Sequence, residues 1–349
     1  MSSRNRHGPA ALVTLVAVVA ALTLVAPAGL GSASTGAAAS PRPAVPAGCL
    51  PPGEAAAATK GPYAVGERTV TFVDTSRPTA ADPARDLPAH PDRTLVTTVL
   101  YPAAAPTSKV AARAEAPVVG ATPAAGSFPL VEFSHGWTAS GPEYVSVLAQ
   151  WARAGYVVAA PTFPLTSGPG ASASDVVNQP GDVSFVITSM TALAADPTDP
   201  LSGHIAPDCT AIAGHSLGAI TTLATVYDSC CVEPRARAAI SISGALLDLD
   251  GGDYRHPPAV PLLLLHGDTD ATIPIGASQS AFSTLIGFRW FVTFHGAGHV
   301  SLFLPPWGNV LQNTVVAFLD YHLKGDDHLE LGLPQRVARS GVASLQRGG

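Results

Sequence analysis

The stretch "CTAIAGHSLGAITTLATVYDS", residues 209–229, joins an apolar run to a second apolar segment through a short turn that contains Ser216. The first seven residues have the composition of a buried strand, and the segment from Leu217 onward predicts an apolar helix. Gly214 and Gly218 stand two residues on either side of the serine. Larger side chains there would collide with the neighbouring strand and helix in a strand-to-helix turn, which exposes the serine hydroxyl. The pattern predicts a nucleophile at Ser216; a small residue in an ordinary loop is the alternative.

Apolar strands alternate with helical segments on both sides of this turn. Two alternating half-buried strands are predicted first, at 67–74 and 93–102. The expected buried strands are 128–136, 156–161, 238–245, 260–268 and 289–296, and the expected helices are 144–155, 182–195, 276–285 and 314–325. Such alternation predicts an α/β protein with a mostly parallel central sheet and helices on both faces.

The N-terminus is basic, then apolar, then rich in small residues, which is the order of a secretory signal peptide. We predict a signal peptide over residues 1–36 with an approximate cleavage site, a Pro/Ala-rich linker or arm over 37–62, one catalytic domain over 63–325, and a tail over 326–349. The expected product is a secreted monomer with no stable membrane span. A membrane anchor formed by an uncleaved N-terminal segment is the alternative, because the apolar run approaches bilayer-spanning length.

Composition indicates a folded domain and argues against nucleic-acid and metal partners. Hydrophobic residues make up 47% of the chain, enough for a sizeable core. A net charge of −6, a charged fraction of 13% and the absence of a Lys/Arg cluster argue against nucleic acid. No Cys/His spacing suggests zinc, so no metal is expected.

The four cysteines are disulfide candidates if the chain is exported. A helix that folds back along the strand before it would bring Cys230 or Cys231 close to Cys209, because a strand rises about 3.3 Å and a helix about 1.5 Å per residue. The cysteine left over would pair with Cys49. Pairing of the neighbours Cys230 and Cys231 looks geometrically poor, and four reduced thiols are the alternative.

A serine nucleophile needs a base, and the base needs an acid that orients it. Asp268 and Asp270 both follow the strand at 260–268, and either could lie at its carboxyl end. His299 follows the next strand in a loop of small residues. The order Ser216, acid, His299 on successive strand ends predicts a Ser-His-Asp triad. His215, His266 and His295 are expected to be packing residues.

An oxyanion hole requires two N–H donors aimed at one point. The backbone of Leu217, directly after the nucleophile, is one candidate. The backbone of Trp137 in the loop after strand 128–136 is the other. The loop at 162–180, with Phe163 and Leu165, is expected to line a substrate-binding wall beside Trp137.

At these residues the sequence resembles the α/β-hydrolase superfamily, over about Val70–Lys324. "FPLVEFSHGW", "GHSLGA", "HGDTDATIP" and "GAGH" look like secreted bacterial relatives of platelet-activating-factor acetylhydrolase, chlorophyllase and dienelactone hydrolase. The polyester-degrading cutinases are similar in layout, although they usually carry methionine where this chain has Leu217. The Asp-x-x-Ile-Pro form of the acid loop in this superfamily favours Asp270 over Asp268.

The resemblance implies an esterase or lipase-like enzyme that cleaves carboxylic esters through an acyl-enzyme, without a cofactor. Its substrate would be a small-molecule or polymeric ester. Only about fifteen residues separate the strands at 238–245 and 260–268, too few for the helical lid of many lipases. The alternatives are an acyltransferase or peptidase with the same triad, a polyester hydrolase, or a binding protein that kept the fold but not the activity.

Overall fold

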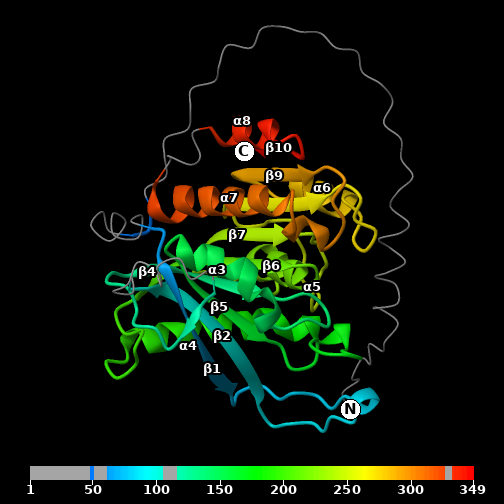
Figure 1. Cartoon of the computed structure of the whole chain (residues 1–349). Coiled ribbons are helices and arrows are strands. Elements are labelled where there is room, and N and C mark those ends of the chain that lie inside the picture. Colours follow the sequence, from blue (N-terminus) through cyan, green and yellow to red (C-terminus); the bar gives the residue numbers. More distant parts are fainter. Residues whose placement is uncertain (1–47, 51–60, 105–115, 327–331) are drawn as a thin grey trace, which may run out of the picture.

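A ten-stranded sheet forms the centre of the chain in the computed structural model, which describes residues 48–50, 61–104, 116–326 and 332–349. Its strand order is β10-β9-β8-β7-β6-β4-β5-β2-β1-β3 (Figure 1). The strands are β1 (Ala64–Asp74), β2 (Arg93–Ala103), β3 (Val118–Val119), β4 (Phe128–Ser134), β5 (Val157–Thr162), β6 (Ile205–His215), β7 (Ala236–Ile242), β8 (Leu262–Gly267), β9 (Arg289–Phe294) and β10 (Ala343–Gly348).

The strands from β5 through β4, β6, β7 and β8 to β9 are all parallel to their neighbours. β1, β2 and β10 pair antiparallel at the two sides of this parallel block. β4 and β8 are buried along their whole length, and the other parallel strands are buried over most of theirs. A sheet with near-continuous apolar strands must be covered on both faces, and the prediction of a mostly parallel central sheet is confirmed.

Helices cover the sheet in two layers, each with its own apolar core. The helices are α3 (Val145–Arg153), α4 (Gln179–Ala195), α5 (Leu217–Tyr227), α6 (Gly276–Thr284), α7 (Gly308–Leu319) and α8 (Leu333–Arg339). Trp151, Phe318 and Val337 of α3, α7 and α8 belong to one buried cluster. Ile187 and Leu223 of α4 and α5 belong to the other, and α6 joins it through buried Ala281. The helices therefore lie on both faces, as expected.

The segment predicted as a C-terminal tail continues the domain. Helix α8 packs into one core layer through Leu333 and Val337. Strand β10 then pairs antiparallel with β9, from Ala343 opposite Phe294 to Gly348 opposite Arg289. Ordered structure therefore extends past the predicted boundary at residue 325. Without β10, β9 would be an edge strand with unpaired backbone N–H and C=O groups, and β10 pairs with them.

The disulfide pairing expected from the sequence is wrong. Cys49 bonds to Cys209, and Cys230 bonds to its neighbour Cys231. The chain does not run on from α5 towards Cys209, because the Asp228 carboxylate accepts hydrogen bonds from the N–H groups of Cys230 and Leu249. Those bonds turn the segment after α5 towards the loop that precedes β8.

The arm that carries Cys49 is fixed from another direction. The Cys49 N–H donates to the carbonyl oxygen of Leu323 at 3.0 Å, and Leu50 is buried in the core layer that contains Cys209. The predicted signal peptide and most of the predicted linker lie outside the described residues. Within the described ranges, no helix is both long and apolar enough to cross a bilayer.

Candidate active site

Ser216 occupies the turn between β6 and α5 with φ 57° and ψ −120°. Residues other than glycine rarely adopt this backbone conformation, and such strain persists where the surrounding structure enforces it. A Cβ atom on Gly214 would collide with the carbonyl oxygen of Gly218, and one on Gly218 would collide with that of Ser134. The two glycines therefore allow the first turn of the helix to lie directly against β6 and β4.

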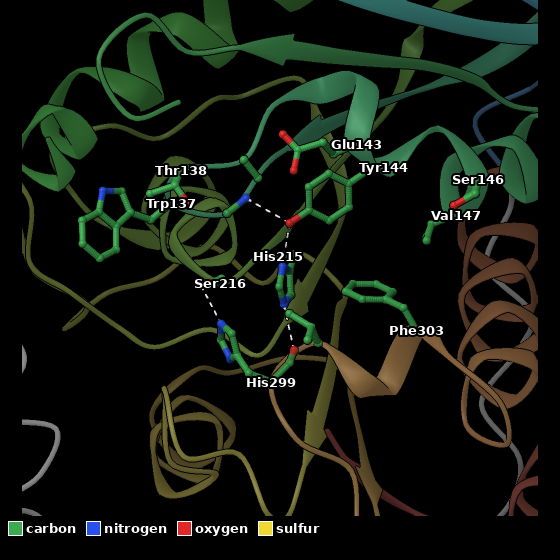
Figure 2. Close-up of a pocket in the computed structure, with 13 residues that line it drawn as sticks. Trp137, Thr138, Glu143, Tyr144, Ser146, Val147, His215, Ser216, His299 and Phe303 are labelled. Carbon is green, nitrogen blue, oxygen red and sulfur yellow. Dashed lines mark hydrogen bonds between the residues drawn. The ribbon is translucent and has the colours of Figure 1, made fainter. Parts of the chain in front are cut away.

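The three residues predicted as a triad form one hydrogen-bonded chain. The Ser216 hydroxyl donates to Nε2 of His299 at 2.7 Å (Figure 2). Nδ1–H of His299 donates to Oδ2 of Asp270 at 2.7 Å. They follow β6, β8 and β9, whose carboxyl ends meet at one edge of the sheet. A hydroxyl on a neutral imidazole that is itself oriented by a carboxylate is poised to lose its proton.

The carboxylate of Asp270 is held by four donors. Oδ1 accepts the backbone N–H groups of Thr272 at 2.8 Å and Ile273 at 3.0 Å. Oδ2 lies 2.7 Å from Nδ1 of His299 and 3.2 Å from Nε2 of His266. Burial alone would raise the pKa of Asp270, but the hydrogen bonds from His266, His299 and Ile273 outweigh it and hold the pKa well below its usual range. The carboxylate therefore stays ionised beside His299.

The rival acid, Asp268, belongs to a different pair. Its Oδ2 lies 3.0 Å from Nδ1 of His295, and its Oδ1 accepts the N–H of Gly296 at 2.7 Å. The side chain of His295 is 49% exposed, whereas that of His299 is 14% exposed. Of the two Asp–His pairs, only the one with Asp270 reaches Ser216.

The loop after β4 places one of the two predicted oxyanion donors. Burial lowers the pKa of His135 to about 4, so its ring is neutral. Nδ1 lies 2.8 Å from the carbonyl oxygen of Gly136, and Nε2 accepts the N–H of Phe163 at 3.0 Å. Because a carbonyl only accepts, Nδ1 carries the proton. The peptide that joins Gly136 to Trp137 is trans, so fixing its C=O also fixes the opposite direction of the Trp137 N–H.

The second predicted donor is the N–H of Leu217, the first residue of α5. The first N–H groups of a helix have no partner inside it. Among the described residues, neither the Leu217 N–H nor the Trp137 N–H donates a hydrogen bond. Both are therefore free to bind an oxygen placed next to Ser216.

Ser216 and His299 open into a pocket of about 390 Å³. The pocket is lined by the loop after β4, the start of α3, the nucleophile turn and the segment that follows His299. Its residues are Gly136, Trp137, Thr138, Ala139, Glu143, Tyr144, Ser146, Val147, His215, Ser216, His299, Val300 and Phe303 (Figure 2). Trp137 is 53% exposed, and its indole N–H donates to the carbonyl oxygen of Ala171 at 2.9 Å. The indole ring is thereby held at the mouth of the pocket.

Two residues predicted to bind substrate are not in this pocket. Phe163 has no exposed surface, and Leu165 is 6% exposed. The Phe163 ring lies 5.0 Å from the His135 ring, centroid to centroid. The Phe163 ring therefore packs against the loop after β4 instead of lining the pocket. The residues missed by sequence reasoning are Tyr144, Val147, Val300 and Phe303, which come from a predicted helix and from the segment after His299.

Comparison with known proteins agrees with the fold. The family model described as Chlorophyllase matches residues 96–250. A search of curated proteins finds no match. Among solved structures, a ferulic acid esterase from Streptomyces cinnamoneus is similar with a TM-score of 0.60 and 21% identity, covering 83% of this chain and 99% of that one. The chain has the α/β-hydrolase fold.

No helical lid lies between β7 and β8. Residues 243–261 connect these strands without a helix. No lid domain is therefore inserted between these two strands. Within the described ranges, no group of three or more His, Cys, Asp or Glu side chains is arranged to hold a metal ion.

Proposed function

We propose that this protein hydrolyses carboxylic esters through an acyl-enzyme, with Ser216 as nucleophile, His299 as general base and Asp270 as the acid that orients it. The observation that carries the proposal is the unbroken chain from the Ser216 hydroxyl through His299 to Asp270, with 2.7 Å between the heavy atoms at each step. Similarity to the Chlorophyllase family model and to a ferulic acid esterase supports the same reaction class.

In the first half-reaction, Oγ of Ser216 attacks the ester carbonyl carbon while its proton moves to Nε2 of His299. The negative charge on the former carbonyl oxygen is bound by the N–H groups of Trp137 and Leu217. When the tetrahedral intermediate collapses, His299 returns the proton to the leaving alkoxide oxygen. The C–O bond breaks and the acyl group remains on Ser216.

In the second half-reaction, water replaces the alcohol. His299 takes a proton from the water as its oxygen attacks the acyl carbon, and the same two N–H groups bind the second oxyanion. Collapse breaks the bond to Ser216, which regains its proton from His299, and the carboxylic acid leaves. Asp270 remains ionised throughout and stabilises the imidazolium of His299 twice in each cycle.

The pocket favours esters with an apolar acyl or aryl group. Trp137, Val147, Val300 and Phe303 present apolar surface around the reacting atoms, and Glu143 is the one carboxylate among the lining residues. The absence of a helix over residues 243–261 leaves the site open, which suits short acyl chains and esters on larger molecules. We further propose that the protein is exported, which the N-terminal pattern and the Cys49–Cys209 disulfide support.

The test is hydrolysis of p-nitrophenyl esters from acetate to palmitate, and of an alkyl ferulate, by the purified protein and by Ser216→Ala. We expect activity in the wild type and its loss in the variant. Ser189→Ala is the matched control, because that hydroxyl only donates to the carbonyl oxygen of Phe185 within α4. Full activity of Ser216→Ala, or no hydrolysis of any ester by the wild type, would overturn the proposal.

A further inference from the structure

The His215 side chain lies next to the proposed nucleophile, is 3% exposed and takes no part in the proposed reaction. Its Nε2 lies 3.0 Å from the carbonyl oxygen of His299. Because a carbonyl oxygen only accepts, Nε2 must carry a proton. Burial, and secondly the neighbouring His299, lowers the pKa of His215 to about 3. The ring is therefore neutral, and Nδ1 is left as an acceptor.

The partner of Nδ1 is the hydroxyl of Tyr144, at 2.8 Å. Burial raises the pKa of Tyr144 to about 12, so the hydroxyl keeps its proton and donates it to His215. The same hydroxyl oxygen accepts the backbone N–H of Gly136 at 3.3 Å. Tyr144 and His215 each accept one hydrogen bond and donate another, so the hydrogen bonds run in one direction from Gly136 through Tyr144 and His215 to the carbonyl of His299 (Figure 2).

These bonds connect three segments that lie far apart in the sequence. Gly136 precedes the proposed oxyanion donor Trp137, His215 precedes the nucleophile, and His299 is the proposed base. Gly136 is held on both sides, at its N–H by Tyr144 and at its C=O by His135. No Cβ would fit there without displacing atoms, since it would lie 3.2 Å from both the Ser216 Cβ and the Tyr144 hydroxyl oxygen.

We propose that Tyr144 and His215 are positioning residues, which hold the loop of the general base and the loop of the oxyanion donor in register with Ser216. The proposal rests on the proposed function. His215 fixes the backbone of His299 by its Nε2–H, and Tyr144 fixes Gly136 by its hydroxyl oxygen. Neither side chain exchanges a proton with substrate, because the polar atoms of both are already hydrogen-bonded to protein groups. Reacting atoms misplaced by an ångström lose about 100-fold in rate, so such bracing has a direct effect on kcat.

Tyr144→Phe tests this with little change in packing. The ring contacts to Phe133, at 4.8 Å, and to Phe303, at 6.0 Å, can be kept, and only the hydroxyl is lost. We expect kcat to fall by about 10- to 100-fold with little change in KM, because the substrate-lining surface is retained and the alignment is not. His215→Gln can place an NH₂ donor at the position of Nε2 for the His299 carbonyl, but it has no acceptor at the position of Nδ1 for the Tyr144 hydroxyl.

The two variants share one broken hydrogen bond, so their effects on kcat should not add in the double variant. Tyr227→Phe is the matched control, since its buried hydroxyl donates to the carbonyl oxygen of Val260 outside the pocket. It should lower stability without lowering kcat. Wild-type kcat in Tyr144→Phe, or additive losses in the double variant, would overturn the proposal.

Two further measurements do not depend on which ester is the substrate. A fluorophosphonate probe is attacked by Ser216 with loss of fluoride, and its labelling rate should fall in Tyr144→Phe by the same factor as kcat. Histidine ¹⁵N spectra should show His215 protonated at Nε2 and His299 protonated at Nδ1. Protonation of neutral His215 at Nδ1 would overturn the proposed positioning role of Tyr144 and His215. If the probe labels Ser216 and the tautomers are as expected, but no ester is hydrolysed, the proposed function is refuted and the positioning role of Tyr144 and His215 is still supported.

Discussion

Asp270→Asn is the substitution that tests the proposed site most severely, because an amide has an acceptor on one side only. In the native protein, Oδ1 of Asp270 serves the N–H groups of Thr272 and Ile273, and Oδ2 serves His299 and His266. All four partners donate. Turning the asparagine NH₂ towards the two backbone N–H groups would leave both without an acceptor, at a cost of about 1–3 kcal/mol each.

The asparagine therefore keeps its oxygen on the backbone side and presents its NH₂ to His299. A donor at that place favours the tautomer in which Nδ1 accepts and Nε2 carries the proton. The Ser216 hydroxyl then meets an N–H and has no base. The carboxylate that would stabilise the imidazolium is also absent. We expect kcat to fall roughly 1,000- to 10,000-fold, which corresponds to about 4–5.5 kcal/mol in activation free energy.

The assay is steady-state hydrolysis of a p-nitrophenyl ester, with the thermal unfolding midpoint as a check on folding. Asp268→Asn is the matched control: it makes the same chemical change two residues earlier, in a pair with His295 that does not reach Ser216. It should keep nearly full activity. If Asp270→Asn retains more than about a tenth of kcat, or Asp268→Asn loses as much, the assignment of the acid is incorrect.

Three other results are expected. Glu143→Gln should raise kcat/KM about two- to fivefold for esters that carry a negative charge and leave neutral esters unchanged, with a smaller gain at high salt. Burial raises the pKa of Glu132 well above 4.5. The unfolded chain therefore releases a proton near pH 4.5 that the folded chain retains, and the free energy of unfolding falls as the pH rises from about 4.5 towards the pKa of the folded state. Glu132→Gln should remove this fall, which urea unfolding at pH 4 and pH 8 measures. Cys49→Ser opens a disulfide with a sequence separation of 160 and should lower the free energy of unfolding by up to about 5 kcal/mol. Cys230→Ser should lower it much less, because a disulfide between adjacent residues closes almost no loop. Equal losses of stability in the two variants would contradict this.

The fold and the order of the proposed triad could be predicted because their determinants are local. Gly214 and Gly218 frame Ser216 within five residues, so the turn can be identified from the sequence, although the collision of a Cβ on Gly218 would be with Ser134 of the neighbouring strand β4. Asp270 and His299 each follow a buried strand closely. Parallel strands bring such positions to one edge of a sheet without any further information.

The disulfides and the pocket wall could not be predicted, because they depend on contacts between distant segments. The turn after α5 is directed by the hydrogen bond that the Leu249 N–H donates to Asp228, and the arm with Cys49 is fixed by the hydrogen bond from its N–H to the carbonyl of Leu323. Nothing near the cysteines encodes either contact. Phe163 is of a residue type that often lines apolar pockets, but its ring is buried against the ring of His135 in the loop after β4.

The histidines at this edge of the sheet show most clearly what determines function here. Both ring nitrogens of His215 and of His266 are hydrogen-bonded to protein atoms, so neither ring can take a proton from a substrate. His295 pairs with Asp268 on the surface. His299 alone joins a carboxylate at one nitrogen to the Ser216 hydroxyl at the other. Taken singly, none of these histidines is marked by the sequence as a base, and the difference in chemistry comes from which carbonyl, carboxylate or hydroxyl the fold places at each nitrogen. Substitutions of the side chains that supply those carboxylates and hydroxyls should therefore alter activity as substitutions of the rings do.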